Sequence, residues 1–232
     1  MYTGRVLRDI ERQMDKVAEG SLKLRLQDLL ALVNRLLAQK PKDRRKLYSL
    51  HEPAVDCISK GKAHKRYEFG TKVSVATTTQ GGFVVGMRAL PGNPYDGHTL
   101  HEALEQVEIL TDQRPDMAFV DRGYRGHGVE TVKVFISGAR RGVTRTIAIL
   151  LRRRSAIEPM IGHMKTDGRL TRCPLKGTTG DALFAVLCGC GHNIRMILRY
   201  LKVILRQLNW LIALLRGSTR GAGSPQALQI AA

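Results

Sequence analysis

Two acidic residues stand where a carboxylate could do catalytic work. The first is Asp121, which follows the short apolar stretch 117–120 in Phe-Val-Asp-Arg-Gly-Tyr-Arg-Gly. A carboxylate that ends a buried strand has its backbone fixed by the sheet, while its oxygens reach the open edge where α/β sheets place their sites. The other interpretation is a turn aspartate that caps the segment after it.

The second is Glu158, in a segment whose periodicity predicts a helix over 144–166. The residues on or near its face, at steps of three and four, are Leu151, Arg154, Ile161 and Lys165. Charged groups within such a partly apolar face cost free energy unless they are paired or bind a metal. A simple ion pair between Arg154 and Glu158 is the alternative. Pro159 disfavours helical dihedral angles at Glu158, so we expect the helix to kink or restart there.

The charge balance indicates a polyanionic partner. Lys and Arg number 38 against 20 Asp and Glu, a formal net charge of +18, while 43% hydrophobic residues suffice for a core. Such an excess favours nucleic acid, because neutralised phosphates release condensed counterions; a membrane surface or ribosomal RNA also fits. The basic segment 39–66 is either a solvated loop or a DNA-facing one, and the sequence leaves both open.

The four cysteines do not indicate a disulfide framework, because no secretory signal opens the chain and we therefore expect a reducing cytoplasm. Cys188, Cys190 and His192 lie close together, but without a spaced Cys-x-x-Cys pair a zinc site is the weaker interpretation. Packing of these residues within a helix is the preferred one.

Periodicity predicts an α/β arrangement. Residues 1–40 have the pattern of a helical hairpin, and 67–76 and 83–90 that of two antiparallel strands around a Gln-Gly-Gly turn. Thr99-Leu-His-Glu102 has the form of a capping box that opens a helix. Strands follow at 117–120 and 132–136, and we expect 117–120 to lie parallel to a strand that precedes it.

The segment 181–216 is largely apolar and predicted to be helical. One stripe is basic and consists of Arg195, Arg199, Lys202 and Arg206; a separate stripe is apolar. The charges interrupt every apolar run before it reaches the length of a membrane span, which is about 20 residues. We therefore expect an amphipathic helix that packs on a core, with a membrane-surface helix as the alternative.

Several stretches in order resemble the catalytic domain of bacterial insertion-sequence DDE transposases, in the superfamily numbered four and five. They are Lys60-Gly-Lys-Ala-His, Tyr67-Glu-Phe-Gly-Thr-Lys-Val, Pro91-Gly-Asn-Pro-Tyr-Asp-Gly-His-Thr-Leu, Val120-Asp-Arg-Gly-Tyr-Arg-Gly and Ala156-Ile-Glu-Pro-Met-Ile-Gly-His-Met-Lys. The superfamily signature is Tyr, two residues, Arg, three, Glu, six, Lys. Arg154, Glu158 and Lys165 match it, whereas Leu151 stands at the Tyr position.

The resemblance implies a ribonuclease-H-like mixed sheet flanked by helices, with Asp121 and Glu158 as the second and third catalytic carboxylates. The two should lie within about 8 Å of each other and share Mg²⁺ or Mn²⁺. The chain would divide into a helical hairpin left from an insertion (1–45), the catalytic domain (46–216) and a disordered tail (217–232). The expected phosphate-binding residues are Lys60, Lys62, Arg122, Arg125, Arg154 and Lys165.

No residue takes the place of the family's first catalytic Asp, whose strand we expect to precede residue 1. Asp56 is the acidic alternative near the first visible strand, although no strand pattern surrounds it. We therefore expect a transposase acting on terminal inverted repeats and target DNA, as a homodimer on DNA in the nucleoid, which as residues 1–232 alone does not cut or join DNA. A catalytically dead DNA-binding remnant and a nuclease of the same fold are the alternatives.

Overall fold

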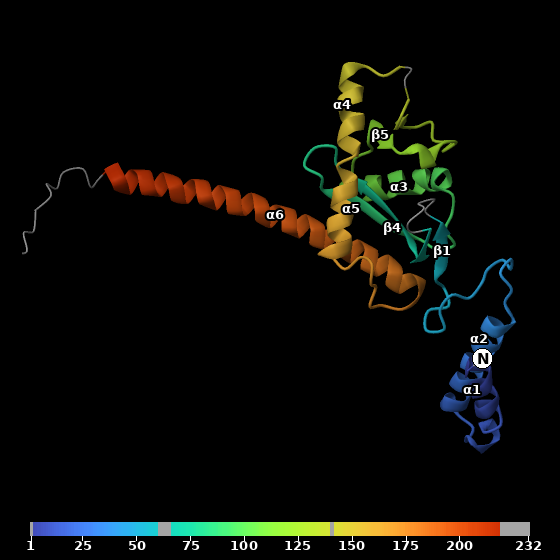
Figure 1. Cartoon of the computed structure of the whole chain (residues 1–232). Coiled ribbons are helices and arrows are strands. Elements are labelled where there is room, and N and C mark those ends of the chain that lie inside the picture. The colour runs from blue at the N-terminus through green and yellow to red at the C-terminus, as the bar shows by residue number, and fades with distance from the viewer. Residues whose placement is uncertain (1, 60–65, 140–141, 219–232) are drawn as a thin grey trace, which may run out of the picture.

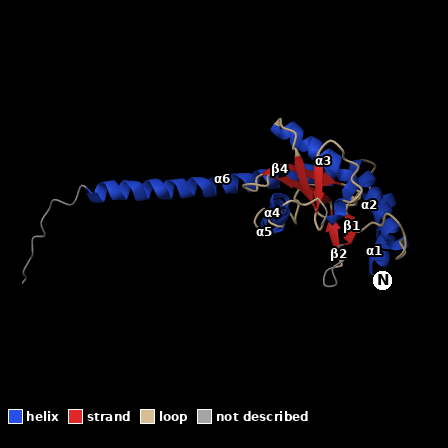
Figure 2. Ribbon diagram, turned by 90° about the horizontal axis from the view of Figure 1, so that it is seen from above, coloured by secondary structure: helices blue, strands red, loops and turns tan. Residues whose placement is uncertain are grey.

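The computed structural model describes residues 2–59, 66–139 and 142–218, and these residues form an α/β fold of small sheets and helices, as expected (Figure 1). Figure 2 shows the strands gathered in one body, from which α6 extends on one side. Helix α6 continues to Ser218, so it includes the first two residues of the tail predicted over 217–232. Residues 219–232 of that tail lie outside the described residues.

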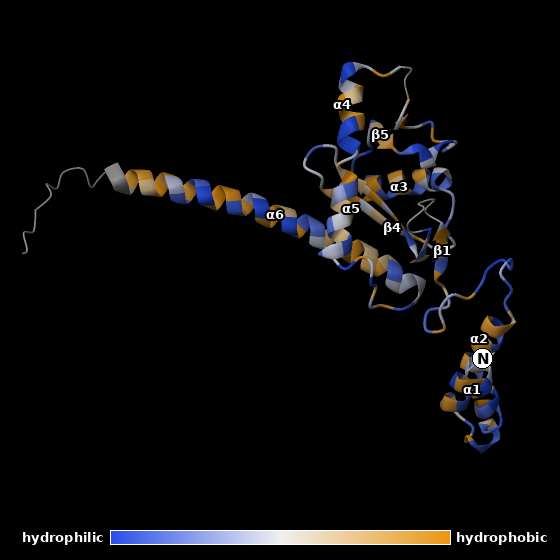
Figure 3. Cartoon of the chain, viewed as in Figure 1, coloured by the Kyte–Doolittle hydropathy of each residue, from blue (hydrophilic) through white to orange (hydrophobic). Residues whose placement is uncertain are grey.

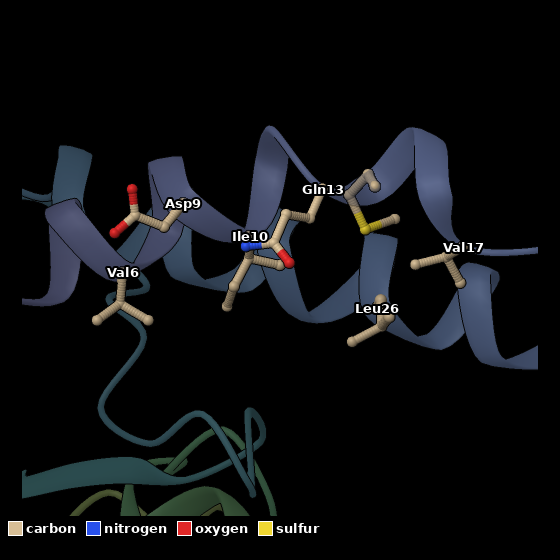
Figure 4. A pocket seen from close by; sticks show the side chains of 7 residues that line it. Val6, Asp9, Ile10, Gln13, Val17 and Leu26 are labelled. Atoms are coloured by element: carbon tan, nitrogen blue, oxygen red, sulfur yellow. The ribbon is translucent and has the colours of Figure 1, made fainter.

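The N-terminal helical hairpin is present and lies apart from the strands (Figure 1). It consists of α1 (Tyr2–Glu11), the short 3-10 turn η1 (Met14–Lys16) and α2 (Ser21–Ala38). Leu7 is buried between the helices, and the Asn34 amide donates a hydrogen bond to Glu11 Oε1 at 3.1 Å. A shallow pocket of about 280 Å³ lies along the hairpin, and its largely apolar lining includes Val6 and Leu26 (Figure 4).

The expected strand over 67–76 is broken into two. β2 (Tyr67–Gly70) pairs antiparallel with β1 (Asp56–Ser59), whereas β3 (Lys72–Thr77) pairs with β4 (Val84–Leu90). Gly70 has φ +145°, a conformation that residues with a side chain rarely adopt, so the chain changes direction there. Asp56, around which the sequence shows no strand pattern, begins β1, a strand too short to show an alternating pattern.

The β3–β4 ladder is the antiparallel hairpin that the sequence predicts, with Val75 opposite Met87. Helix α3 (Asp96–Thr111) covers one face, where Val107 packs against Gly86. On the other face Met87 belongs to a core with Met164 and Cys188, which come from α5 (Ile157–Thr166) and α6 (Gly177–Ser218).

A second core lies on the other side of α3. It joins Leu100 of that helix to Val120 of β5 (Met117–Val120) and to Val129 and Val132, which precede β6 (Lys133–Ile136). β5 pairs in parallel with β6 rather than with a preceding strand, which corrects the expected order. The described strands form three two-stranded sheets and not the one mixed sheet that was expected.

Helix α3 begins at Asp96, with Tyr95 as its N-cap, so the capping box expected at Thr99 is wrong. The Thr99 hydroxyl donates to the Asp96 carbonyl within the first helical turn, and the side chain is buried. The N-cap therefore lies four residues earlier than the capping-box pattern suggested, at Tyr95 instead of Thr99.

The helix expected over 144–166 is two helices, α4 (Arg145–Arg154) and α5. The Thr144 side chain accepts a hydrogen bond from the Ile147 N–H and caps α4. The break falls at Ser155 and Ala156, which places Pro159 in the first turn of α5, where a missing N–H costs nothing. The predicted restart is confirmed: α5 begins at Ile157, one residue before Glu158.

Helix α6 packs on the body only along its first part and then projects from it (Figures 1 and 3). Asn193 holds the edge of β4, donating to the Val84 carbonyl and accepting from its N–H, both at 2.8 Å. Beyond Tyr200, which stacks on Phe83, apolar side chains such as Leu208 are about half exposed. The expected packing on a core is therefore wrong for the distal part. Among the described residues, α6 is also the one helix that length and composition alone would allow to cross a membrane.

Candidate carboxylate site

Asp121 directly follows β5 and is exposed, as the sequence predicts for a carboxylate at a strand end. Its Oδ1 accepts a hydrogen bond from the Gly123 N–H at 2.9 Å and caps the short 3-10 turn η2 (Arg122–Tyr124). The capping interpretation is therefore observed. Within the part of the chain that the structure describes, no hydrogen bond engages Oδ2, so one oxygen is left for another ligand.

The N-terminus of α3 clamps the loop after Asp121. The Tyr95 hydroxyl donates to the Arg125 carbonyl at 2.9 Å, and a Cβ atom at Gly97 would lie 2.9 Å from the same carbonyl oxygen. A Cβ atom at Gly123 would lie 2.6 Å from Asp96 Oδ2 and 3.1 Å from Asp121 Oδ1. Glycine at 97 and 123 therefore lets the helix and the loop approach closely, with the two carboxylates around Gly123.

Lys72 of β3 neutralises one of these carboxylates. Its Nζ lies 2.6 Å from Asp96 Oδ1 and donates a second hydrogen bond to the Pro94 carbonyl at 2.8 Å. Both side chains of the ion pair are largely shielded from solvent. The ammonium group thus ties β3 to the start of α3, and Asp121 is left as the carboxylate on this loop without a cationic partner among the described residues.

The pKa of Tyr124 is affected by both carboxylates. Burial raises the pKa of its hydroxyl above 10.0, and the negative charges of Asp96 and Asp121 raise it further. Its ring packs against the core formed by Leu100 and Val120. The phenol is therefore neutral near pH 7, with its ring against the apolar core and its hydroxyl within the field of the two carboxylates.

Glu158 lies on α5 with its side chain 72% exposed. Its Oε1 is 3.5 Å from Arg154 Nη2, so the ion pair that the sequence left open is observed, at a distance that makes it weak. Arg154 Nε is buried and has no hydrogen-bond partner in the described part of the chain. Lys165 lies about two turns further along α5, with its Nζ 3.9 Å from Glu68 Oε2 of β2.

The other predicted phosphate-binding residues differ in their surroundings. Arg122 lies over Gly138, where a Cβ atom would come within 2.7 Å of its Nη2. Arg125 is exposed, and only its backbone carbonyl takes part in the clamp with Tyr95. Lys60 and Lys62 lie outside the described residues.

The described residues do not form a complete three-carboxylate site. Among them, no group of three or more His, Cys, Asp or Glu side chains is placed to hold a metal ion. The donors that are present, exposed carboxylate oxygens, have the chemistry that Mg²⁺ and Mn²⁺ prefer. Asp121 and Glu158 each contact a near neighbour in sequence, and their sharing of one ion stays a prediction. Asp56 accepts a hydrogen bond from the Gly92 N–H at 2.7 Å and so holds the turn before α3.

The Cys188, Cys190 and His192 group contacts backbone instead of a common centre. The Cys188 thiol donates to the Gly168 carbonyl at 3.3 Å, and His192 Nε2 lies 3.3 Å from the Gly82 carbonyl. Burial lowers the pKa of His192 below 6.5, and the positive charges of Arg195 and Arg199 add to this shift. The imidazole is therefore neutral near pH 7 and donates its N–H to the carbonyl.

Sequence reasoning missed Lys72, Asp96 and Tyr124 as parts of the site. Each lies within a stretch that carried the family resemblance, so those stretches could have pointed to these residues. The capping-box pattern drew attention to Thr99, whereas the helix begins at Asp96. The contact of Asp96 with the loop after β5 joins segments about 25 residues apart, which local periodicity does not reveal.

Residues 39–133 match the family model of the transposase DDE domain. This segment contains β1 to β5 and η2, and therefore Asp121 with the clamp around it, but it ends before Glu158. No curated protein and no solved structure matches the chain. The match supports a DDE transposase, a class of enzyme that acts on DNA and generally uses divalent metal ions.

Proposed function

We propose that the chain is the catalytic portion of a bacterial insertion-sequence transposase of the superfamily numbered four and five, acting on terminal inverted repeats and target DNA. The observation that carries this proposal is the position of Asp121: exposed at the end of β5, held by the α3 clamp, and inside the segment that matches the transposase DDE domain. The helical hairpin, 1–45, is then an accessory part beside a catalytic domain over 46–216.

Asp121 and Glu158 are the residues that would hold Mg²⁺ or Mn²⁺. Asp121 offers Oδ2, and Glu158 is exposed enough to turn away from Arg154, since a contact of 3.5 Å is easily given up. A bound ion of this kind stabilises the charge on the attacking and leaving oxygens of a phosphodiester during in-line displacement. Water would complete its coordination, as is usual for Mg²⁺ in proteins.

The protein's own groups then position the DNA. Arg154, released by Glu158, presents a planar fork to phosphate, whereas Lys165 acts as a point charge. Arg122 and Arg125 follow Asp121 closely in sequence and are exposed with it, so they are placed to contact the same DNA backbone. Lys72 and Asp96 are positioning residues, because they hold the loop that carries Asp121.

A catalytically dead DNA-binding protein is the second candidate. The Arg154–Glu158 ion pair and the absence of a three-residue acidic group among the described residues favour it. We expect both candidates to bind DNA. They differ in whether a metal ion binds at Asp121.

Mn²⁺ binding separates the two candidates. Electron paramagnetic resonance of Mn²⁺ titrated into the DNA-bound chain should show an ion that Asp121→Asn removes. The matched control is Asp116→Asn, because Asp116 is an exposed aspartate that immediately precedes the same strand. If Asp121→Asn and the unchanged chain bind Mn²⁺ equally, the metal is not held by Asp121 and the dead DNA-binding protein is the better account.

A further inference from the structure

The Asp96 carboxylate turns one oxygen toward the loop that carries Asp121. A Cβ atom at Gly123 would lie 2.6 Å from Asp96 Oδ2 and 3.1 Å from Asp121 Oδ1. The sum of these two distances is the largest separation that the two oxygens can have. Two oxygen ligands of one Mg²⁺ lie about 3 to 4 Å apart, because each is about 2.1 Å from the ion. Little side-chain movement is therefore needed to bring both carboxylates onto one ion.

One oxygen of Asp96 is held by a lysine and the other is available. Lys72 Nζ lies 2.6 Å from Oδ1, and in the described part of the chain no hydrogen bond engages Oδ2. The Asp96 side chain is 31% exposed, so an ion that keeps several waters can reach it. Carboxylates that bind metal ions are themselves held by hydrogen bonds, which fix their orientation. The contact with Lys72 has this form, since it holds Asp96 by one oxygen and leaves the other directed at Gly123.

Glu158 does not join this pair of carboxylates in the structure. Its Oε1 lies 3.5 Å from Arg154, and the described residues include no group of three His, Cys, Asp or Glu side chains that could hold a metal ion. Asp96 and Asp121 therefore stand together without it. An ion that binds Asp121 before Glu158 leaves Arg154 finds its second carboxylate at Asp96.

We propose that Asp96 is a direct ligand of the divalent ion at Asp121, in addition to holding the loop after β5. The inference rests on the proposed function, which places that ion at Asp121. A second carboxylate raises the affinity of a site for a hard cation, because the number of charged ligands sets the strength of binding. Lys72 competes with the ion for the negative charge of Asp96. The two residues together thus set how tightly the chain binds the ion without DNA.

Mn²⁺ titration of the intact chain without DNA, followed by electron paramagnetic resonance, tests the ligand. Asp96→Asn should weaken Mn²⁺ binding by about tenfold or more. The variant keeps the size of the side chain and the backbone carbonyl that accepts from Thr99, so circular dichroism should show the fold intact. Glu158→Gln should weaken binding less. Glu102→Gln is the matched control: it removes one negative charge from the same helix, where Glu102 pairs with Arg88, and should leave the affinity unchanged.

Lys72→Gln distinguishes a metal ligand from a residue that only holds the loop. The variant removes the competing ammonium group and keeps the Asp96 carboxylate, so a ligand role predicts tighter Mn²⁺ binding. A role limited to the loop predicts weaker binding in Lys72→Gln and Asp96→Asn alike, because both changes break the tie between β3 and α3. Electron spin echo measurements in D₂O, which count the waters on Mn²⁺, should find more of them in Asp96→Asn than in the unchanged chain.

The outcomes separate this inference from the proposed function. Asp96→Asn with the Mn²⁺ affinity of the unchanged chain would overturn the inference, as would weaker binding in Lys72→Gln. If Asp121→Asn removes the ion in the same experiments, the proposed function stands without Asp96 as a ligand. An ion that survives Asp121→Asn, or no Mn²⁺ binding by the unchanged chain, would overturn the inference together with the metal site on which it rests.

Discussion

Asp96 and Asp121 flank Gly123 so closely that a methyl group there would lie 2.6 Å from Asp96 Oδ2 and 3.1 Å from Asp121 Oδ1. The two residues come from the start of α3 and the end of β5, and the loop between β5 and β6 brings them together. The position of the Asp121 carboxylate therefore depends on a contact with a different element, and not only on its own strand.

Gly123→Ala should impair metal binding more than folding. The added methyl group meets the ends of two short side chains rather than backbone, so the carboxylates move and the fold survives. We expect weaker Mn²⁺ binding, with a loss of unfolding free energy at or below about 1 kcal/mol. The control is Gly162→Ala on α5, which adds its methyl group in open space and should leave Mn²⁺ binding unchanged. Loss of fold in Gly123→Ala, seen as lost cooperative unfolding, would contradict this.

Asp96→Asn should lower the pKa of Tyr124. The negative charge of Asp96 raises that pKa, so its removal shifts the titration of the phenol to lower pH, while burial, the largest cause of the raised pKa, remains. Absorbance titration of tyrosinate, with Tyr124→Phe used to assign the signal, measures the shift. Glu102→Gln is the control, since Glu102 pairs with Arg88 elsewhere on α3. An unchanged Tyr124 titration in Asp96→Asn would show that the two groups do not interact.

DNA binding should weaken steeply with salt, because phosphate contacts by a chain of net charge +18 release counterions. Arg125→Gln should reduce the slope of log affinity against log salt by about one, the expected value for one lost phosphate contact. Its side chain is exposed while its backbone carbonyl accepts from Tyr95, so the fold should be unaffected. Salt-independent affinity in a fluorescence anisotropy titration would exclude phosphate contacts as the main source of binding.

Protonation of His192 should destabilise the fold. Burial lowers its pKa from the ordinary 6.5, so the unfolded chain binds the proton more readily than the folded one. The contribution to unfolding free energy is therefore full above pH 6.5 and is lost as pH falls toward the lower pKa of the folded state. Urea unfolding at pH 7.5 and 5.5 measures this loss, and His192→Gln should show less of it. An identical loss in the variant would assign the pH dependence to other groups.

Local patterns predict the parts of the fold that depend on local structure. The alternation in 72–77 and 84–90 predicts the β3–β4 hairpin, and the apolar stretch before Asp121 predicts β5. Both predictions depend only on the residue types within the strand itself. The break at Gly70 and the pairing of β5 with β6 depend on partners distant in sequence, and neither was predicted.

The same limit applies to the site and to α6. Asp121 was predicted as a site residue from its position at a strand end, whereas Asp96 and Lys72 lie near it only through tertiary contacts. The apolar stripe of α6 was recognised, but a periodic stripe is the same whether the helix packs on its own core or on another chain. Only the burial of Ala185 and Cys188 shows which side of α6 the described fold covers.

Iron-mediated cleavage of bound DNA tests the central claim most directly, namely that Asp121 holds a divalent metal ion against DNA phosphate. Fe²⁺ can replace Mg²⁺ on oxygen ligands, and with ascorbate and peroxide it generates hydroxyl radicals that cut DNA near the ion. The unchanged chain and Asp116→Asn should produce the same localised cuts, and Asp121→Asn should abolish them while still binding DNA. Equal cutting by Asp121→Asn would contradict the account, because the metal would then lie elsewhere.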